Sequence, residues 1–149
     1  MSGEDAQELV LTDRSIYKSW VSHTIRFSDL DPLGHLNNAI YATFMEAGRI
    51  KIVHPLTKKH GDGNLDIVIA RLTIDFRREL TYPGIVDIGT SIKRVGHKSV
   101  VFVNGVFKQD SDECAATSVS HMVFFDLIKR ASAVPPPVIR KGLSAYTIE

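Results

Sequence analysis

A short segment rich in carboxylate, amide and imidazole side chains is the part of the sequence best suited to chemistry. It spans residues 26–38 and includes Asp31, His35 and the adjacent residues Asn37 and Asn38. The Asp31 carboxylate is ionised at neutral pH, so it can activate water as a general base or attack an acyl group directly. A helix that begins at Asn38 offers backbone N–H groups without intrahelical acceptors, which suit an oxyanion. The segment therefore fits hydrolysis of an activated acyl group.

The same residues also fit a purely structural role. Residues 31–34 are Asp-Pro-Leu-Gly, which matches a type I turn with Asp first, Pro second and Gly fourth. Asn37 or Asn38 can simply cap the helix, because asparagine is among the preferred N-cap residues. Residue types alone leave both interpretations open.

Motifs for other common chemistries are missing from the sequence. There is no Gly-x-Gly-x-x-Gly fingerprint for dinucleotides and no Gly-x-Ser-x-Gly nucleophile elbow. The phosphate-loop-like spacing at residues 84–91 has Thr90 where lysine is required. The histidines lack paired metal-ligand spacing, and Cys114 has no basic neighbour in sequence, so it is expected to be a packing residue. We therefore expect no metal and no cofactor.

Length and composition indicate one ordinary globular domain. The chain has 149 residues, of which 44% are hydrophobic and 23% charged, and this composition excludes a disordered chain. A net charge of +1 argues against a nucleic-acid partner. The single cysteine fits a reducing compartment, and no apolar run approaches the roughly 20 residues of a membrane span. The polar N-terminus is unlike a signal peptide, so we expect a soluble cytoplasmic protein.

One long helix should position the acidic segment. It is expected to begin at Asn37 or Asn38 and to end near Pro55, because the residue before a proline disfavours the helical conformation. Its apolar residues cover nearly the whole circumference, which predicts a helix enclosed by other structure. Glu46 and Arg49 are three residues apart and are expected to pair on the polar face that remains.

Alternating hydrophobic residues predict strands on both sides of this helix. The strands are expected at residues 20–27, 67–80, 85–95, 99–108 and 113–125. The last three are joined by short links, which favours an antiparallel meander, and a sheet of about five strands must bury one face against the helix. This is an α+β layout. Residues 1–18 are expected to form an N-terminal extension with residues 1–7 frayed, and residues 19–149 the domain, with a C-terminal tail from Pro135 lying over the surface.

The segment around Asp31 resembles the signature of a known family. Residues 26–41, continued by residues 44–49, resemble the 4-hydroxybenzoyl-CoA thioesterase-like proteins, which are hotdog-fold acyl-CoA thioesterases. Weaker similarity extends the resemblance over roughly residues 20–140. It implies a hotdog fold, in which an antiparallel sheet of about five strands wraps a long central helix. The pattern of helix and strands agrees with this fold.

The resemblance also implies roles for individual residues. Asp31 corresponds to the catalytic carboxylate, and the backbone N–H of Asn38 corresponds to the oxyanion donor. His35 follows the turn and either lines the site or stabilises the loop. The paired asparagines resemble fatty-acyl-CoA branches more than aromatic-acyl ones. Another branch uses a helix glutamate as the base; Glu46 is the local candidate, although pairing with Arg49 favours a structural role.

Candidate substrate-binding residues lie outside this segment. They are Tyr41, Phe44, Arg77, His97, Lys98 and Ser99. The two aromatic residues are candidates for an acyl tunnel, with core packing as the alternative. The basic residues, with Arg78, suit the phosphates of CoA, and solvated strand ends are the alternative.

The expected activity is hydrolysis of an acyl-CoA thioester to a free acid and CoA. The alternative is a non-catalytic acyl or acyl-CoA binding protein, because a fold does not fix a function. A hotdog dehydratase would need a catalytic histidine paired with a helix carboxylate, which this segment does not provide. An exposed sheet edge, together with the resemblance, implies a homodimer with its active sites at the subunit boundary, and such dimers can pair into a homotetramer.

Overall fold

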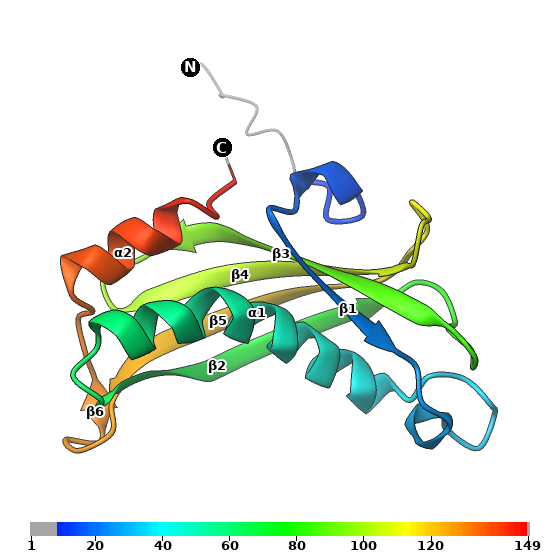
Figure 1. The fold of residues 1–149 in the computed structure, drawn as a ribbon, viewed down its shortest axis with the longest axis horizontal. Helices are drawn as coiled ribbons and strands as arrows, with labels where there is room; N and C mark the ends of the chain where they lie inside the picture. The colour runs from blue at the N-terminus through cyan, green and yellow to red at the C-terminus, as the bar shows by residue number, and fades with distance from the viewer. Residues whose placement is uncertain (1–8, 149) are drawn as a thin grey trace, which may run out of the picture.

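The computed structural model describes residues 9–148, and its strands form one curled antiparallel sheet (Figure 1). The strands are β1 (Ser19–Thr24), β2 (Leu65–Phe76), β3 (Ile85–Val95), β4 (Ser99–Lys108), β5 (Cys114–Asp126) and β6 (Ala131–Ser132). The helices are α1 (Asn38–His60) and α2 (Pro137–Ser144), and two 3-10 turns span Arg14–Ile16 and Phe27–Asp29. The strand order is β1-β3-β4-β5-β2, with β6 paired to β5. The predicted fraying of residues 1–7 lies outside the described residues.

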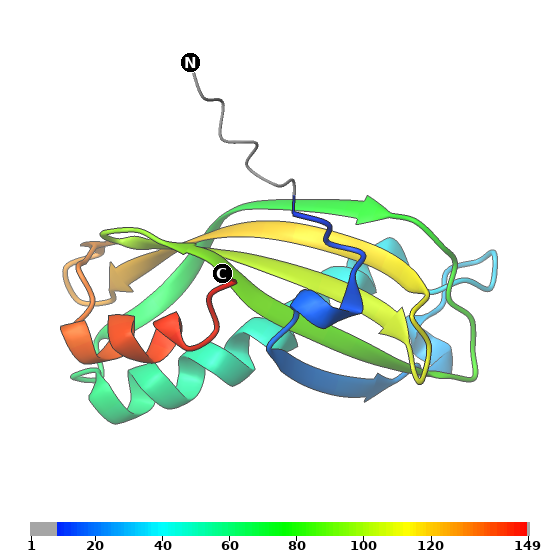
Figure 2. The same ribbon diagram turned by 90° about the horizontal axis from the view of Figure 1, so that it is seen from above.

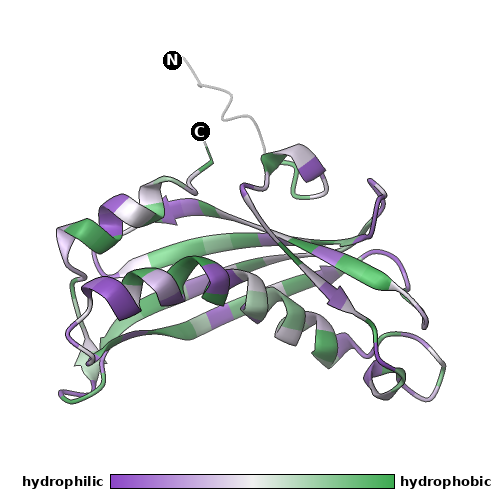
Figure 3. Cartoon of the chain, in the orientation of Figure 1, coloured by the Kyte–Doolittle hydropathy of each residue, from purple (hydrophilic) through white to green (hydrophobic). Residues whose placement is uncertain are grey.

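The sheet curls over α1, which runs along one of its faces (Figure 2). One long helix against a curled antiparallel sheet of about five long strands is the predicted hotdog arrangement, and this prediction is confirmed. Figure 3 shows hydrophobic residues along the central strand β4 and hydrophilic ones in the turn between β4 and β5. Within residues 9–148, no helix has both the length and the apolar content needed to cross a membrane.

Helix α1 begins where the sequence predicts and ends later. The Asn37 side chain accepts a hydrogen bond from the Ala39 N–H at 3.0 Å, so Asn37 is the N-cap. The predicted end near Pro55 is wrong, because the helix continues to His60. Pro55 is exposed, and the next residue, Leu56, packs against the core beneath the end of the helix. Tertiary packing therefore outweighs the hydrogen bond that proline cannot make.

Helix α1 buries one stripe and not its whole circumference, so the prediction of an enclosed helix is wrong within this chain. The buried residues are Tyr41, Phe44, Met45, Gly48, Arg49, Ile52 and Val53. Their spacing of three and four residues defines a single face, and Ile50 on another face is 48% exposed. The predicted Glu46–Arg49 pair is also absent from the ion pairs of the described residues. Arg49 lies on the buried stripe, whereas Glu46 is exposed.

Gly48 allows α1 to approach the sheet closely. A Cβ atom at this position would collide with Thr90 Oγ1 and would lie 3.2 Å from Asn104 Nδ2. Both polar residues are fully buried, and Asn104 Nδ2 donates a 2.7 Å hydrogen bond to Thr90 Oγ1. The helix therefore crosses the sheet at a row of small or internally bonded polar side chains.

The strand predictions are largely confirmed. The bounds predicted for β3 and β4 match the structure, and those of β5 differ by one residue at each end. Strand β1 ends at Thr24 and not at residue 27, and β2 ends at Phe76 and not at residue 80. Strand β2 also contains a register shift between Ile69 and Arg71, which interrupts the regular alternation.

The C-terminal tail belongs to the core, so the prediction that it only covers the surface is wrong. Ile139 and Leu143 of α2 are fully buried and pack with Ile52 of α1. Arg140 Nη1 donates to the backbone carbonyls of Gly96 and His97. These contacts tie α2 to both α1 and the β3–β4 turn.

The outer face of the sheet is covered by the segment that precedes β1. Tyr17 is 5% exposed and packs with Trp20 and Phe107, whose ring centroids lie 5.9 Å from its own. Leu9 and Leu11 join the same cluster. Residues of the expected N-terminal extension therefore contribute to a second apolar layer.

Candidate active site

Residues 29–37, which we call the Asp31 loop, form a closed turn that leads directly into α1. The Asp31 N–H donates to the His35 carbonyl at 2.8 Å, and the Gly34 N–H donates to the Asp31 carbonyl at 3.0 Å. Leu30 and Leu36 pair as an antiparallel bridge below the turn. Gly34 has a φ of 82°, a conformation that glycine adopts without strain. The turn expected from Asp-Pro-Leu-Gly is therefore present.

The Asp31 carboxylate uses one oxygen to hold this turn. Oδ1 accepts hydrogen bonds from the Leu33 N–H at 2.9 Å and the His35 N–H at 3.2 Å. Within the described chain Oδ2 accepts no hydrogen bond, and the residue is half-buried. One oxygen thus has a structural partner, while the other is open to water or a ligand.

Polar contacts anchor the loop at its base and at its tip. Asp29 is 1% exposed, and its carboxylate accepts hydrogen bonds from the Arg26 backbone N–H and guanidinium at 2.8 Å each. The backbone carbonyl of Asp29 accepts a hydrogen bond from the Asn37 N–H at 2.9 Å. The hydrogen bond from the Arg26 side chain lowers the pKa of Asp29. At the tip, His35 Nε2 lies 3.2 Å from Glu79 Oε2. The loop is therefore held against both the helix start and the segment after β2.

The start of α1 offers a free backbone donor beside the loop. The Asn37 side chain accepts a hydrogen bond from the Ala39 N–H, whereas the N–H of Asn38 has no acceptor in the described chain. An unbonded N–H is expected at the first helical residue. Asn38 lies three residues after His35, whose carbonyl accepts the Asp31 N–H. Three residues of chain span at most about 10 Å, so Asn38 lies within about 10 Å of His35.

Tyr41 and Phe44 are core residues behind the helix start. They are 3% and 6% exposed, and they belong to the apolar cluster under the first half of α1. Burial raises the pKa of Tyr41 to about 12, and its hydroxyl donates to the Arg78 carbonyl at 3.4 Å. The Phe44 ring stacks on His23 with 5.2 Å between centroids. In this conformation both aromatic residues pack the core.

The candidate phosphate-binding residues fall into two groups. Arg77 follows β2 at the Asp31 end of the sheet and is exposed. His97, Lys98 and Ser99 lie at the other end of β3, whose 11 residues span about 35 Å. A single chain therefore brings Arg77, but not the β3–β4 turn, to the end of the sheet that holds Asp31.

One surface groove lies along α1, and none of its lining residues belongs to the Asp31 loop or to the first four residues of the helix. It has a volume of about 810 Å³ and runs between α1 and β2, and its helical wall extends from Ala42 to Thr57. Ala42 lies four residues, about one turn, beyond Asn38. We call it the α1–β2 groove; its helical wall includes Glu46 and Arg49.

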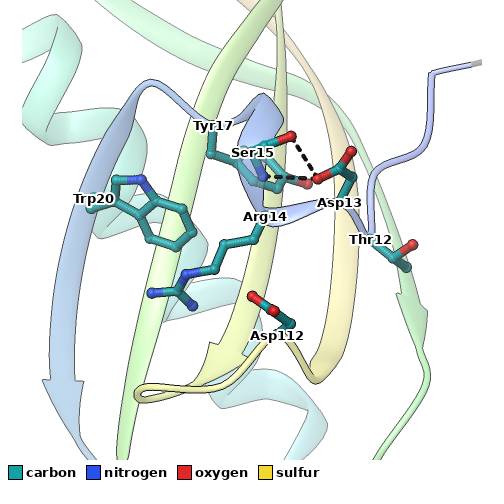
Figure 4. A pocket seen from close by; sticks show the side chains of 7 residues that line it. All are labelled: Thr12, Asp13, Arg14, Ser15, Tyr17, Trp20 and Asp112. Atoms are coloured by element: carbon teal, nitrogen blue, oxygen red, sulfur yellow. Dashed lines mark hydrogen bonds between the residues drawn. The ribbon is translucent and has the colours of Figure 1, made fainter.

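Another hollow lies on the outer face (Figure 4), and it shares no lining residue with the α1–β2 groove. It has a volume of about 720 Å³ and is lined by Thr12, Asp13, Arg14, Ser15, Tyr17, Trp20 and Asp112. Its cation is already paired, because Arg14 Nη2 lies 2.7 Å from Asp87 Oδ2 and the guanidinium sits over the Trp20 ring. This hollow has no connection to the Asp31 loop.

The sequence did not single out Arg49 as functional. A usable signal exists, because Arg49 falls in register with Met45 and Ile52 on the buried stripe. No group of three or more His, Cys, Asp and Glu residues in the described part of the chain is placed to hold a metal ion.

Comparison with protein families gives one clear match. A family model described as the thioesterase-like superfamily matches residues 25–143, which include the Asp31 loop, all of α1 and strands β2 to β5. No curated protein sequence matches the chain.

Solved structures with the same fold are numerous. The PA5185 protein from Pseudomonas aeruginosa PAO1 is 21% identical, with 92% of this chain and 96% of that chain covered and a TM-score of 0.81. A predicted thioesterase from Bacillus stearothermophilus is 25% identical, with coverage of 88% and 97% and a TM-score of 0.80. A thioesterase from Thermus thermophilus, solved with coenzyme A and zinc, is 29% identical, with coverage of 87% and 94% and a TM-score of 0.73.

Proposed function

We propose a function from one premise: the chain belongs to the thioesterase-like superfamily. Thioester hydrolysis is the activity class that this membership supports. The specific proposal is that the chain hydrolyses an acyl-CoA thioester to a free acid and CoA. The observation that carries it is the Asp31 loop, in which the unbonded Oδ2 of Asp31 and the free N–H of Asn38 flank the start of one helix.

In the proposed reaction Asp31 acts on the thioester carbonyl carbon. Oδ2 either takes a proton from a water molecule that attacks this carbon or attacks the carbon itself. The carbonyl oxygen becomes negatively charged and accepts a hydrogen bond from the Asn38 N–H at the positive end of the helix dipole. Collapse of the intermediate then breaks the carbon–sulfur bond, and the departing thiolate takes up a proton to give CoA. On the direct-attack route a water molecule afterwards hydrolyses the acyl–Asp31 anhydride to the free acid. His35 supports this geometry by fixing the loop through Glu79.

Coenzyme A is the proposed carrier of the acyl group. The Thermus thermophilus relative was solved with coenzyme A, and it is 29% identical to this chain. The α1–β2 groove begins about one turn from Asn38 and has apolar walls, including Ile50, Val53 and Leu72, which suit an acyl chain. Fatty-acyl groups fit these walls better than strongly polar ones.

The proposed site is completed by a second copy of the chain. His97, Lys98 and Ser99 lie about 35 Å along β3 from the end of the sheet that holds Asp31. Antiparallel pairing of two sheets places the far end of one copy beside the near end of the other. The basic turn of one copy would then meet the CoA phosphates at the Asp31 loop of the other.

The test is hydrolysis of acyl-CoAs of increasing chain length by the wild type and by Asp31→Asn. Asparagine keeps a side-chain oxygen for the Leu33 and His35 N–H groups, so the turn is expected to survive while the base is lost. Turnover should fall at least about 100-fold. Asp112→Asn, which changes an exposed carboxylate in the β4–β5 turn, is the matched control. Tight acyl-CoA binding without turnover by the wild type would favour the binding-protein alternative.

A further inference from the structure

The end of the molecule opposite the Asp31 loop carries positive charge that the described chain does not pair. The last turn of α1, the β3–β4 turn, the β5–β6 turn (residues 127–130) and the start of α2 lie together at this end, on the left in Figures 1 and 2. Exposed cations gather there, and no ion pair of the described residues includes them: Lys58, Lys59, Lys98, Lys129, Arg130 and Lys141. Because the whole chain has a net charge of only +1, its positive charge is concentrated at one end.

Apolar side chains are exposed at the same end. In the β5–β6 turn Ile128 is 71% exposed and Leu127 is 41% exposed, and in the first turn of α2 Val138 is 45% exposed. Lys129 and Arg130 directly follow Ile128 in the chain. Exposed apolar side chains flanked by lysine and arginine are typical of protein surfaces that lie in a membrane interface, where the apolar groups enter the headgroup boundary and the cations meet anionic lipids.

The backbone N–H groups of the β5–β6 turn are all hydrogen-bonded within the chain. Those of residues 128 and 129 donate to Asp126 Oδ1 at 2.9 Å each, and the Arg130 N–H donates to the Asp126 carbonyl at 2.8 Å. The Leu127 N–H donates to the Asn64 carbonyl at 2.8 Å. Removal of an unpaired N–H from water is costly, so this turn can enter a less polar medium at a lower cost than an open loop.

We propose that this end of the molecule binds the surface of an anionic lipid bilayer, with Ile128 entering the headgroup region while Lys129 and Arg130 contact lipid phosphates. Anionic lipids are favoured over zwitterionic ones because the unpaired cations gain from a negative surface potential. The shape of the end favours a bilayer over an acidic protein. The β5–β6 turn projects from the end of the sheet (Figure 1), and an apolar tip enters a fluid interface directly, whereas a protein partner would need a surface of matching shape.

The inference goes beyond the proposed hydrolysis and does not depend on it. Ile128 and Lys129 belong neither to the Asp31 loop nor to the proposed CoA-binding residues. Substitutions at these two positions should therefore leave the hydrolysis of a short-chain acyl-CoA in solution unchanged. A chain that binds lipid vesicles without hydrolysing thioesters, or the reverse, separates the two proposals.

Co-sedimentation of the full chain with lipid vesicles tests the proposal. Wild type should bind mixed phosphatidylcholine and phosphatidylserine vesicles at least about tenfold more tightly than phosphatidylcholine vesicles, and added salt should weaken this binding. Lys129→Glu changes the charge by two units and should weaken binding at least about tenfold. Lys108→Glu, the matched exposed change at the other end of the sheet, should alter binding less than about twofold.

Two results of this experiment would overturn the proposal. Equal effects of Lys129→Glu and Lys108→Glu would show that the basic end does not face the lipid. Equal binding to the two kinds of vesicle, or binding to neither, would exclude an anionic bilayer and favour an acidic protein as the partner. A raised KM for acyl-CoA in Lys129→Glu with unchanged vesicle binding would assign these cations to CoA and overturn the proposal as well.

A fluorescent label tests the entry of Ile128 into the bilayer. Ile128→Cys can be labelled selectively with an environment-sensitive fluorophore, because Cys114 is the single native cysteine and is buried. Addition of phosphatidylserine vesicles should shift the emission of this label to shorter wavelength. The same label on Asp112→Cys, in the exposed β4–β5 turn, should show no shift. Unchanged emission at position 128 on vesicle-bound protein would overturn the proposal.

Discussion

Asp31 combines a structural and a proposed chemical role in one carboxylate. Oδ1 accepts hydrogen bonds from two backbone N–H groups and so closes the turn, whereas Oδ2 accepts no hydrogen bond within the described chain. The turn interpretation and the catalytic interpretation are therefore compatible at this residue. A turn that depends on its own carboxylate also holds that carboxylate in a fixed direction, which is useful to a base.

Substitutions at Asn38 distinguish a catalytic role of its side chain from one of its backbone N–H. Asn37 is the N-cap, so Asn38→Ala removes no cap and should retain most activity. Asn38→Pro removes the amide hydrogen, and proline fits the first helical position. Loss of one oxyanion donor costs about 100- to 1000-fold in turnover. Steady-state hydrolysis by the two variants, after circular dichroism confirms folding, checks this order, and equal losses would assign the donor to the side chain.

Asp29 should make stability depend on acid pH. Its pKa is lowered mainly by the Arg26 side-chain hydrogen bond, so it binds protons less readily in the folded state than in the unfolded one. The resulting stabilisation is complete above the ordinary aspartate pKa of about 4 and is lost as pH falls through the lower folded value. Asp29→Asn should cost about 1 kcal/mol at pH 7 and progressively less below pH 4.

Urea unfolding at several pH values measures this difference. Asp112→Asn is the control, because its carboxylate is exposed, and it should give a pH profile parallel to wild type. A destabilisation by Asp29→Asn that is constant down to pH 3 would contradict the role given to the Arg26 contact.

At the scale of elements, the crossing of α1 over the sheet depends on Gly48. A Cβ there would collide with Thr90 Oγ1, whose position is fixed by a hydrogen bond from Asn104. Gly48→Ala should therefore destabilise the fold by about 1–3 kcal/mol, although alanine favours helices. Chemical denaturation measures the free energy of unfolding of this variant. The control is Lys59→Ala, an exposed substitution in the same helix, whose stability should lie within about 0.5 kcal/mol of wild type. A stabilised Gly48→Ala variant would show that the helix can move away from the sheet at little cost.

Helix α2 has a related structural role. It covers the second half of α1 through Ile139 and Leu143, which explains why α1 can continue beyond Pro55. It also holds the β3–β4 turn through Arg140, so the proposed CoA-binding residues of that turn are supported from the C-terminus.

At the scale of the whole molecule, the proposed composite site makes a complementation prediction. Asp31→Asn and Lys98→Ala should each lower hydrolysis of acyl-CoA, the first in kcat and the second mainly in KM. Refolding a mixture should restore activity, because a mixed dimer has one site with Asp31 and Lys98 both intact. Activity of the mixture is compared with that of each variant refolded alone. A mixture no more active than the sum of its parts would place both residues in the same copy's site.

Features of this protein that depend on local patterns could be predicted from the sequence. The Asp-Pro-Leu-Gly turn, the helix start at Asn37 and the bounds of β3 and β4 follow from turn chemistry, capping and alternation, which act over a few residues. The α+β layout follows from the same signals. The assignment of Asp31 and Asn38 to catalysis remains a prediction built on these local features.

Which side of each helix or strand is covered depends on packing between distant segments, so it became known from the folded structure. The passage of α1 beyond Pro55, the burial of α2 and the isolation of Arg49 depend on contacts between segments distant in sequence. Helical spacing made a Glu46–Arg49 pair possible, but packing turned one residue inward and left the other in solvent. Burial is a property of the assembled layers, so residue spacing could not reveal it.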